Sequence, residues 1–288
     1  KAKEGEPFWE SQWGKGRPGW HIECSAMAGA IFKEYPIDIH SGGVDLKFPH
    51  HDNEIAQSEA YYCCDNWINH FWHTGHLHIK GKKMSKSLKN FTTIKQILEV
   101  YTAKQVRFLF LMHQWNTLMN YSPEESFPEA IKKEKQFDEF FKNIKAILRQ
   151  CNVHDTRQAW TSEDQLLDST LLQKQKSVRD ALCDNFNTPK AIQELFELMT
   201  QTNKYLSQNP KEIKIPLVRQ VSKFVFDILL SFGIYEQGDY PSVTGAGQEG
   251  GASYEETITP LMNVLTKYRD QVKNNAGEGG KELFKISD

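Results

Sequence analysis

Residues 73–91 read HTGHLHIKGKKMSKSLKNF. The segment His76–Ile79 alternates polar and apolar residues, which predicts a short strand. The next sixteen residues contain a glycine turn and six lysines but no acidic residue. Two ammonium groups three positions apart on a serine-rich turn, Lys83 and Lys86, can neutralise the β and γ phosphates of ATP as pyrophosphate departs. A solvated, lysine-rich surface loop is the structural alternative for this pattern.

Upstream of this stretch, residues 48–54 read FPHHDNE and are predicted to open a helix. His50 and Glu54, four positions apart, share one helical face, so both side chains can reach one ion, whereas His51 points about 100° away. Cys24 lies further upstream, in the string GRPGWHIECS. A thiolate, an imidazole and a carboxylate are all acceptable zinc ligands. A buried cysteine beside a helix-terminal pair is the alternative interpretation of the same residues.

The composition is that of an ordinary globular protein, with 39% hydrophobic and 25% charged residues in a chain of 288. These values argue against a disordered, collagen-like or disulfide-scaffold protein. No apolar run approaches the ~18 residues of a membrane span, so no membrane partner is expected. Five cysteines are an odd number for a bridged framework and indicate a reduced, intracellular chain. The net charge of −2 by itself gives no reason to expect a polyanionic partner.

Hydrophobic periodicity divides the chain into four regions. Residues 1–121 mix short apolar segments with glycine and proline breaks and read as α/β. Residues 122–236 carry four amphipathic helices with short connections, which predicts an all-α bundle. Residues 237–253 are rich in glycine and read as a flexible linker, and residues 254–288 begin a further helix.

Three details of the bundle can be predicted. Thr188 is expected to cap the third helix, since Pro189 follows it at the first helical position. Leu172 is expected on the buried face of the second helix. Gly233 is expected to end the fourth helix in the left-handed conformation.

The strings GRPGWHIECSAMA, DIHSGGVDLKFPHHDNEIAQSEA and HTGHLHIKGKKMSKSLKNF, in this order and spacing, resemble cysteinyl-tRNA synthetases, and the eukaryotic members more closely. The KMSKS string at residues 83–87 is similar to the signature loop of class I aminoacyl-tRNA synthetases. The resemblance spans the whole chain. It implies the C-terminal half of a Rossmann-like catalytic domain followed by an antiparallel helical bundle that binds tRNA. The implied activity is cysteine-tRNA ligation, in which L-cysteine is activated by ATP to cysteinyl-adenylate and transferred to tRNA(Cys).

The resemblance also implies roles for individual residues. It makes Cys24, His50 and Glu54 zinc ligands, with the Zn2+ ion selecting the substrate thiolate. The other residues that it implies are Trp20 and His40 in the cysteine pocket, Gly42, Gly43 and Asp45 near the adenosine, and Lys83 and Lys86 as the catalytic contacts to ATP and pyrophosphate. The implied partners are tRNA(Cys), L-cysteine and ATP with Mg2+, the implied location is the cytoplasm, and a homodimer is left open.

Two parts of the family pattern do not occur in this sequence, a His-Ile-Gly-His turn and a fourth zinc-ligating cysteine. We therefore expect a fragment that lacks the N-terminal half of the catalytic domain and does not activate cysteine alone. Two other functions are open. One is a cysteine ligase that acts on an amino sugar, which would lack a long helical extension. The other is a noncatalytic RNA-binding or scaffold derivative of a synthetase, which would gain nothing by keeping the zinc-ligand set and both lysines.

Overall fold

The computed structural model describes residues 5–33, 35–79, 82–83, 92–150, 159–208, 213–240, 262 and 264–269. The chain divides into two compact units, Lys1–Pro241 and Ser242–Asp288. In the smaller unit the structure describes only helical residues within 262–269, which fall in the helix expected after residue 254. Most of the expected linker lies outside the described residues. No helix in the described ranges is both long and apolar enough to cross a bilayer.

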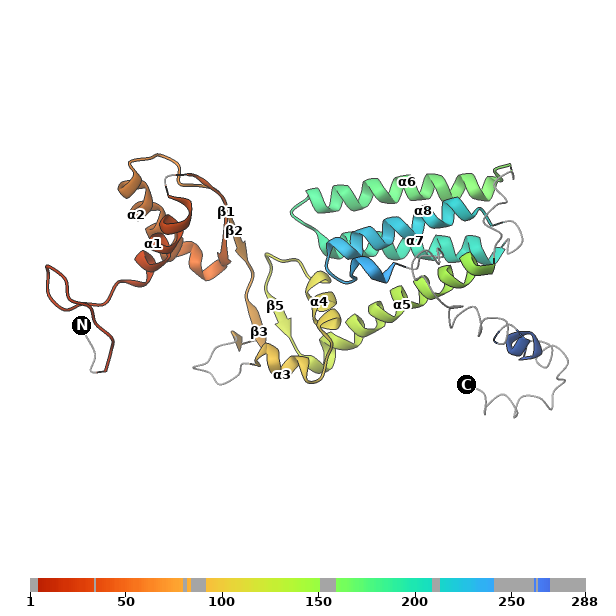
Figure 1. Cartoon of the computed structure of the whole chain (residues 1–288), viewed down its shortest axis with the longest axis horizontal. Coiled ribbons are helices and arrows are strands. Elements are labelled where there is room, and N and C mark those ends of the chain that lie inside the picture. Colours follow the sequence, from red (N-terminus) through yellow and green to blue (C-terminus); the bar gives the residue numbers. More distant parts are fainter. Residues whose placement is uncertain are drawn as a thin grey trace, which may run out of the picture. The chain divides into compact units, whose positions relative to one another are not determined.

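Two helices and two parallel strands form the first part of the larger unit (Figure 1). In chain order they are α1 (Trp20–Phe32), β1 (Ile37–Gly43), α2 (Asp52–Tyr62) and β2 (Ile68–Thr74). The register of the β1–β2 pair sets Ile37 opposite Ile68. A parallel pair needs a crossover connection, and α2 supplies it. Ile37, Ile68 and Trp67 are buried together as a small core, against which residues of both helices pack.

The connection from β1 to α2 departs from a regular helix. A 3-10 turn, Val44–Leu46, is followed by a π turn, Lys47–His51. Phe48 is extended there, with φ −139° and ψ 134°, since the residue before a proline is pushed out of the helical region. The α-helix that was expected to open at Phe48 therefore begins only at Asp52. His50 and His51 project from a wide turn, and both are buried.

A second, three-stranded sheet follows in the chain. Its strands are β3 (Leu77–Ile79), β4 (Lys82–Lys83) and β5 (Met119–Tyr121), and β3 pairs with β4 antiparallel and with β5 parallel. The expected strand near His76–Ile79 is thus confirmed as β3. Gly75 precedes β3. A Cβ at this position would lie 1.8 Å from the carbonyl oxygen of Thr117, so there is no room for a side chain.

Six α-helices lie in the rest of the described part of the larger unit, which ends with a 3-10 turn at Gln237–Asp239. They are α3 (Ile94–Leu98), α4 (Ala103–Leu111), α5 (Pro123–Gln150), α6 (Ser162–Cys183), α7 (Thr188–Gln208) and α8 (Ile215–Ser231). Helices α6 and α7 pack side by side, and α8 contacts α5, α6 and α7 (Figure 1). The bundle core includes the fully buried Phe137, Leu195 and Leu229. Each such side chain contributes about 1.5–3 kcal/mol by its removal from water. The four amphipathic helices expected between residues 122 and 236 are confirmed as α5 to α8.

The caps of these helices differ in part from expectation. Asn187, not Thr188, caps α7, since its Oδ1 accepts a hydrogen bond from the Lys190 backbone N–H at 3.0 Å. Leu172 is 60% exposed, because the buried stripe of α6 runs along the neighbouring face, which includes Leu171. Gly233 adopts φ 68° beyond the end of α8, as expected.

Candidate metal centre

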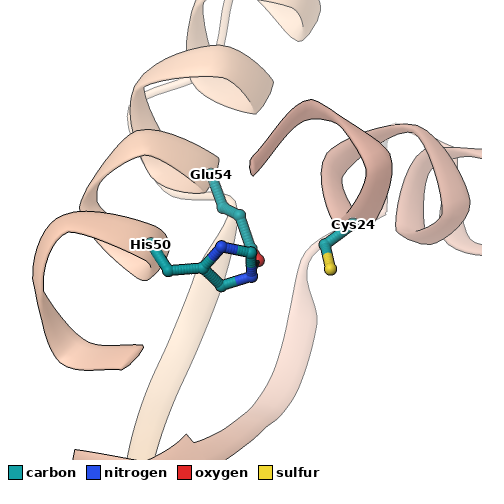
Figure 2. Close-up of side chains that lie close together, drawn as sticks. All are labelled: Cys24, His50 and Glu54. Atoms are coloured by element: carbon teal, nitrogen blue, oxygen red, sulfur yellow. Dashed lines mark ion pairs between the residues drawn. The ribbon is translucent and has the colours of Figure 1, made fainter. Parts of the chain in front are cut away.

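Cys24, His50 and Glu54 lie together in space (Figure 2). Cys24 comes from α1, His50 from the π turn, and Glu54 from the first turn of α2. One donor atom from each residue, a sulfur, a ring nitrogen and a carboxylate oxygen, lies within 4.8 Å of the other two. His50 is 3% exposed and Glu54 is 1% exposed. The three residues grouped from the sequence are therefore neighbours, and their role as metal ligands stays a prediction.

Close packing of α1 against α2 sets the distance between the two sides of this site. Gly29 of α1 faces Tyr62 of α2, and a Cβ at position 29 would lie 2.5 Å from the tyrosine hydroxyl oxygen. One turn earlier, the Ser25 hydroxyl donates a hydrogen bond to Gln57 Oε1 at 2.7 Å. The small Gly29 and the hydrogen bond from Ser25 to Gln57 therefore hold α1, which carries Cys24, close beside α2, which carries Glu54.

Glu54 is a buried carboxylate that lies between two histidines. Its Oε1 lies 2.5 Å from His50 Nε2, and its Oε2 lies 2.8 Å from His40 Nε2. Both contacts are short, but their angles are not those of hydrogen bonds. Neither oxygen therefore has a hydrogen-bond partner of good geometry among the described residues. Buried charges are costly unless they are paired or bind a metal. The unsatisfied oxygens therefore fit a cation between Glu54 and its neighbours.

The Cys24 thiol responds to the same surroundings. Burial, and then the negative charge of Glu54, raises the pKa of Cys24 above its ordinary value. A coordinated metal reverses this balance, since a ligating thiol loses its proton. A thiolate, an imidazole and a carboxylate form a donor set that suits zinc, and a catalytic zinc site keeps one position for substrate beside three protein ligands.

Two histidines that the sequence interpretation did not select lie behind the site. His21 Nδ1 is 2.8 Å from His50 Nδ1, on the side of the ring opposite to the nitrogen that faces Glu54. His73 Nε2 is 2.9 Å from His51 Nδ1. Such outer partners fix the orientation and tautomer of a metal-ligating imidazole. The clustering of histidines early in the chain was the available signal for them.

His51 also lies near Glu54. Donor atoms of His40, His51 and Glu54 lie within 4.8 Å of one another. Burial, followed by the neighbouring His40, His73 and His50, lowers the pKa of His51 to about 4. His51 is grouped with His40 and Glu54 and not with Cys24 and His50, so the expectation that it does not readily join the His50–Glu54 pair stays a prediction.

The other predicted site residues are distributed around this centre. The Trp20 ring lies 4.6 Å from the His50 ring and is 61% exposed. Gly43 ends β1, and a Cβ there would lie 2.5 Å from Asp45 Oδ1, so glycine lets the aspartate fold back over the strand end. Asp45 Oδ1 is 3.9 Å from His76 Nδ1. Lys86 lies outside the described residues, and only the backbone of Lys83 is described.

Comparison with known proteins identifies relatives of this chain. Residues 1–132 match the tRNA synthetases class I (C) catalytic domain, and residues 177–224 match the DALR domain. The chain is 47% identical over 279 residues to "Cysteine--tRNA ligase, cytoplasmic" of Dictyostelium discoideum, covering 96% of this chain and 42% of the relative. The protein of the same name from Gallus gallus is 44% identical over 292 residues, which is 100% of this chain and 39% of the relative. The chain belongs to the cysteinyl-tRNA synthetase family.

The chain spans about two fifths of the length of those curated relatives. Two solved structures share its fold at low identity. The LeuRS of Agrobacterium radiobacter, in a ternary complex with tRNA and LeuAMS, aligns with a TM-score of 0.55 at 17% identity, covering 68% of this chain and 25% of that one. Methionyl-tRNA synthetase of Mycobacterium tuberculosis with methionyl-adenylate aligns with a TM-score of 0.54 at 17% identity, covering 74% and 45%. The expected fold class, α/β followed by the all-α region of a class I synthetase, is confirmed.

Proposed function

We propose that the protein is a cytoplasmic cysteine-tRNA ligase, which activates L-cysteine with ATP and Mg2+ and transfers the cysteinyl group to tRNA(Cys). The observation that carries this proposal is the convergence of Cys24, His50 and Glu54 within 4.8 Å in a chain of this family. The relatives from Dictyostelium discoideum and Gallus gallus carry the name of this activity. The match of residues 177–224 to a DALR domain favours a tRNA substrate over an amino sugar.

Cys24, His50 and Glu54 hold zinc in this proposal, with the buried Glu54 carboxylate supplying the negative charge. When bound there, zinc supplies a Lewis acid with an affinity for the thiolate of cysteine. Serine and alanine offer no thiolate. Discrimination then exceeds the ~1–3 kcal/mol that one small group yields in an apolar pocket, and no hydrolytic editing is needed.

The surrounding residues position the substrate. The ring of Trp20, in contact with His50, provides an aromatic wall, and His40 lies on the opposite side of Glu54. We assign both to the cysteine pocket. We assign Gly42, Gly43 and Asp45 at the end of β1 to the adenosine, where glycine allows close approach of a ligand.

Charge neutralisation completes the reaction. The cysteine carboxylate attacks the α phosphorus of ATP, and Lys83 and Lys86 stabilise the departing pyrophosphate. Because phosphoryl transfer needs mainly positioning and electrostatic stabilisation, no side-chain nucleophile is required. In this proposal residues 1–121 form the C-terminal half of the catalytic domain, with the zinc site and the lysine loop. Residues 122–236 contact tRNA, residues 237–253 form a linker, and residues 254–288 form a helical extension.

A titration of the cobalt-loaded chain with amino acids tests the proposal. Loading with one equivalent of Co2+ gives a thiolate-to-cobalt charge-transfer band through Cys24. L-Cysteine is expected to intensify this band by adding a second thiolate, whereas L-serine leaves it unchanged. In the Cys24→Ser variant the initial band is absent. An equal response to the two amino acids, or no response to cysteine at saturation, would overturn the proposed selection by thiolate.

A further inference from the structure

The carboxylate of Glu54 faces two different sets of donors. Its Oε1 is directed at His50, and its Oε2 is directed at His40. Donor atoms of His40, His51 and Glu54 lie within 4.8 Å of one another, as do those of Cys24, His50 and Glu54. Glu54 is the only member common to these two sets among the described residues.

We propose that His40, His51 and Glu54 form a second metal position, adjacent to the thiolate position and sharing the Glu54 carboxylate with it. Two imidazoles and one carboxylate are a donor set that binds divalent zinc in other proteins. Because the set has no sulfur, it suits borderline divalent ions such as Zn2+, Co2+ and Ni2+. The inference concerns metal binding alone and does not depend on which reaction the protein catalyses.

Unsatisfied polar atoms support this position. His40 Nε2 and both oxygens of Glu54 are buried and lack a hydrogen-bond partner within the described part of the chain. His51 is 3% exposed. Polar atoms without hydrogen-bond partners in a buried place are costly. A cation here would contact His40 Nε2 and Glu54 Oε2, while Oε1 faces the thiolate position.

A glycine leaves space at the ring nitrogen of His51. A Cβ added to Gly42 of β1 would lie 2.9 Å from Leu46 Cδ1, 3.0 Å from His51 Cε1 and 3.1 Å from His51 Nε2. The other ring nitrogen, Nδ1, is already engaged by His73 at 2.9 Å. His51 Nε2 is therefore the nitrogen that can bind a metal, and His73 is the outer partner that orients the ring.

The two positions differ in the metals that they favour and in the metal concentration at which they fill. The thiolate position favours soft and borderline metals, so it fills first with zinc or cobalt. The second position fills at higher metal concentration. One further expectation rests on the proposed function: a metal ion on His40 occupies a residue of the proposed cysteine pocket, so the second ion and cysteine are expected to compete.

Cobalt titration of the metal-free, full 288-residue chain tests the proposal. The unmodified chain is expected to bind two Co2+ ions in sequence, the first with a thiolate charge-transfer band and the second with d–d absorption but no further thiolate band. Cys24→Ser is expected to keep one ion and lose the thiolate band. His51→Ala is expected to keep the thiolate band and lose the second ion. His70→Ala, which removes an exposed histidine from the same strand as His73, is the matched control and should bind as the unmodified chain does.

A milder variant guards against misfolding of His51→Ala. Gly42→Ala places a methyl group against His51 Nε2 and should weaken binding of the second ion at least tenfold while leaving the thiolate band intact. Far-UV circular dichroism checks that each variant keeps its helices. The proposal is overturned if the unmodified chain binds a single ion, if Cys24→Ser binds none, or if His51→Ala and His70→Ala both retain two ions. Loss of the thiolate band in the unmodified chain would instead count against the proposed function.

Discussion

His50 is held between two neighbours that act on its opposite ring nitrogens. Nε2 faces Glu54 at 2.5 Å, and Nδ1 faces His21 at 2.8 Å. A hydrogen on Nδ1, shared with His21, leaves the lone pair of Nε2 free for a metal. The tautomer on which metal binding depends is therefore selected by a residue that is not itself a ligand.

Removal of this outer partner should weaken the metal site without abolishing it. His21→Ala is expected to reduce zinc affinity about 10–100-fold, which is typical for the loss of such a partner. His21→Asn keeps a polar atom near the position of Nδ1 and should restore most of the affinity. Competition with a chromophoric chelator measures both variants. His70→Ala serves as control, and unchanged affinity in His21→Ala would show that His50 needs no outer partner.

The sequence predicted which residues form this centre better than it predicted their contacts with neighbouring residues. Cys24, His50 and Glu54 could be grouped because their donor types and the family motifs agree. The contacts of His21 and His73 could not be foreseen, because they depend on how α1 and β2 lie against the π turn. That turn itself depends on Phe48, whose extended backbone no hydrophobic period reveals.

At the scale of elements, α6 and α7 are joined by a buried polar contact. The Tyr205 hydroxyl donates to Asp164 Oδ1 at 2.5 Å and accepts from the backbone N–H of Lys214 at 2.8 Å. Burial acts to raise the pKa of Asp164, but hydrogen bonds from Thr161 and Tyr205 outweigh it and hold the pKa below the ordinary aspartate value. A carboxyl group with a lowered folded-state pKa stabilises the fold above its unfolded-state pKa, and this stability is lost as pH falls through the folded-state value.

Tyr205→Phe should therefore destabilise the bundle in a pH-dependent way. We expect the free energy of unfolding at neutral pH to fall by about 1.5–3 kcal/mol, as for a hydrogen bond to a charged group. The difference from the unmodified chain should shrink in acid, where Asp164 is protonated in both. Urea unfolding followed by circular dichroism at neutral and acid pH measures this. Tyr61→Phe, at an exposed tyrosine, should change nothing, and a pH-independent loss in Tyr205→Phe would contradict the role of the Asp164 charge.

The end of α8 gives a second prediction at this scale. Gly233 has φ 68°, and a Cβ there would lie 3.1 Å from the Arg107 guanidinium. Gly233→Ala should cost about 1–2 kcal/mol of unfolding free energy, because L-residues with a side chain disfavour left-handed backbone. Gly238→Ala is the control, since no atom lies within 4 Å of its added Cβ. Equal stability of the two variants would contradict this account.

Helices were easier to predict than strands in this chain. The helices α5 to α8 follow from apolar residues at helical spacing, although the single residue that caps α7 and the exposure of Leu172 depend on tertiary packing. Strands β1 and β2 have no regular alternation of buried and exposed residues. Parallel pairing also depends on a distant partner across α2, which local sequence cannot supply.

At the scale of the whole molecule, three motifs in a fixed order predicted the family, whereas the net charge of −2 did not point to an RNA partner.

We expect the chain to bind a tRNA(Cys) transcript, with an affinity that falls as salt concentration rises because phosphate contacts release counterions. Filter binding over a series of salt concentrations measures this. The absence of any binding at low salt would favour the ligase that acts on an amino sugar.

The central claim is that Cys24, His50 and Glu54 together hold a zinc ion that binds the thiolate of cysteine. X-ray absorption at the zinc edge, on the chain loaded with one equivalent of zinc, tests it directly. We predict one sulfur neighbour at about 2.3 Å beside nitrogen and oxygen neighbours, and a second sulfur when L-cysteine, but not L-serine, is added. A zinc shell without sulfur, or one that cysteine leaves unchanged, would contradict the claim.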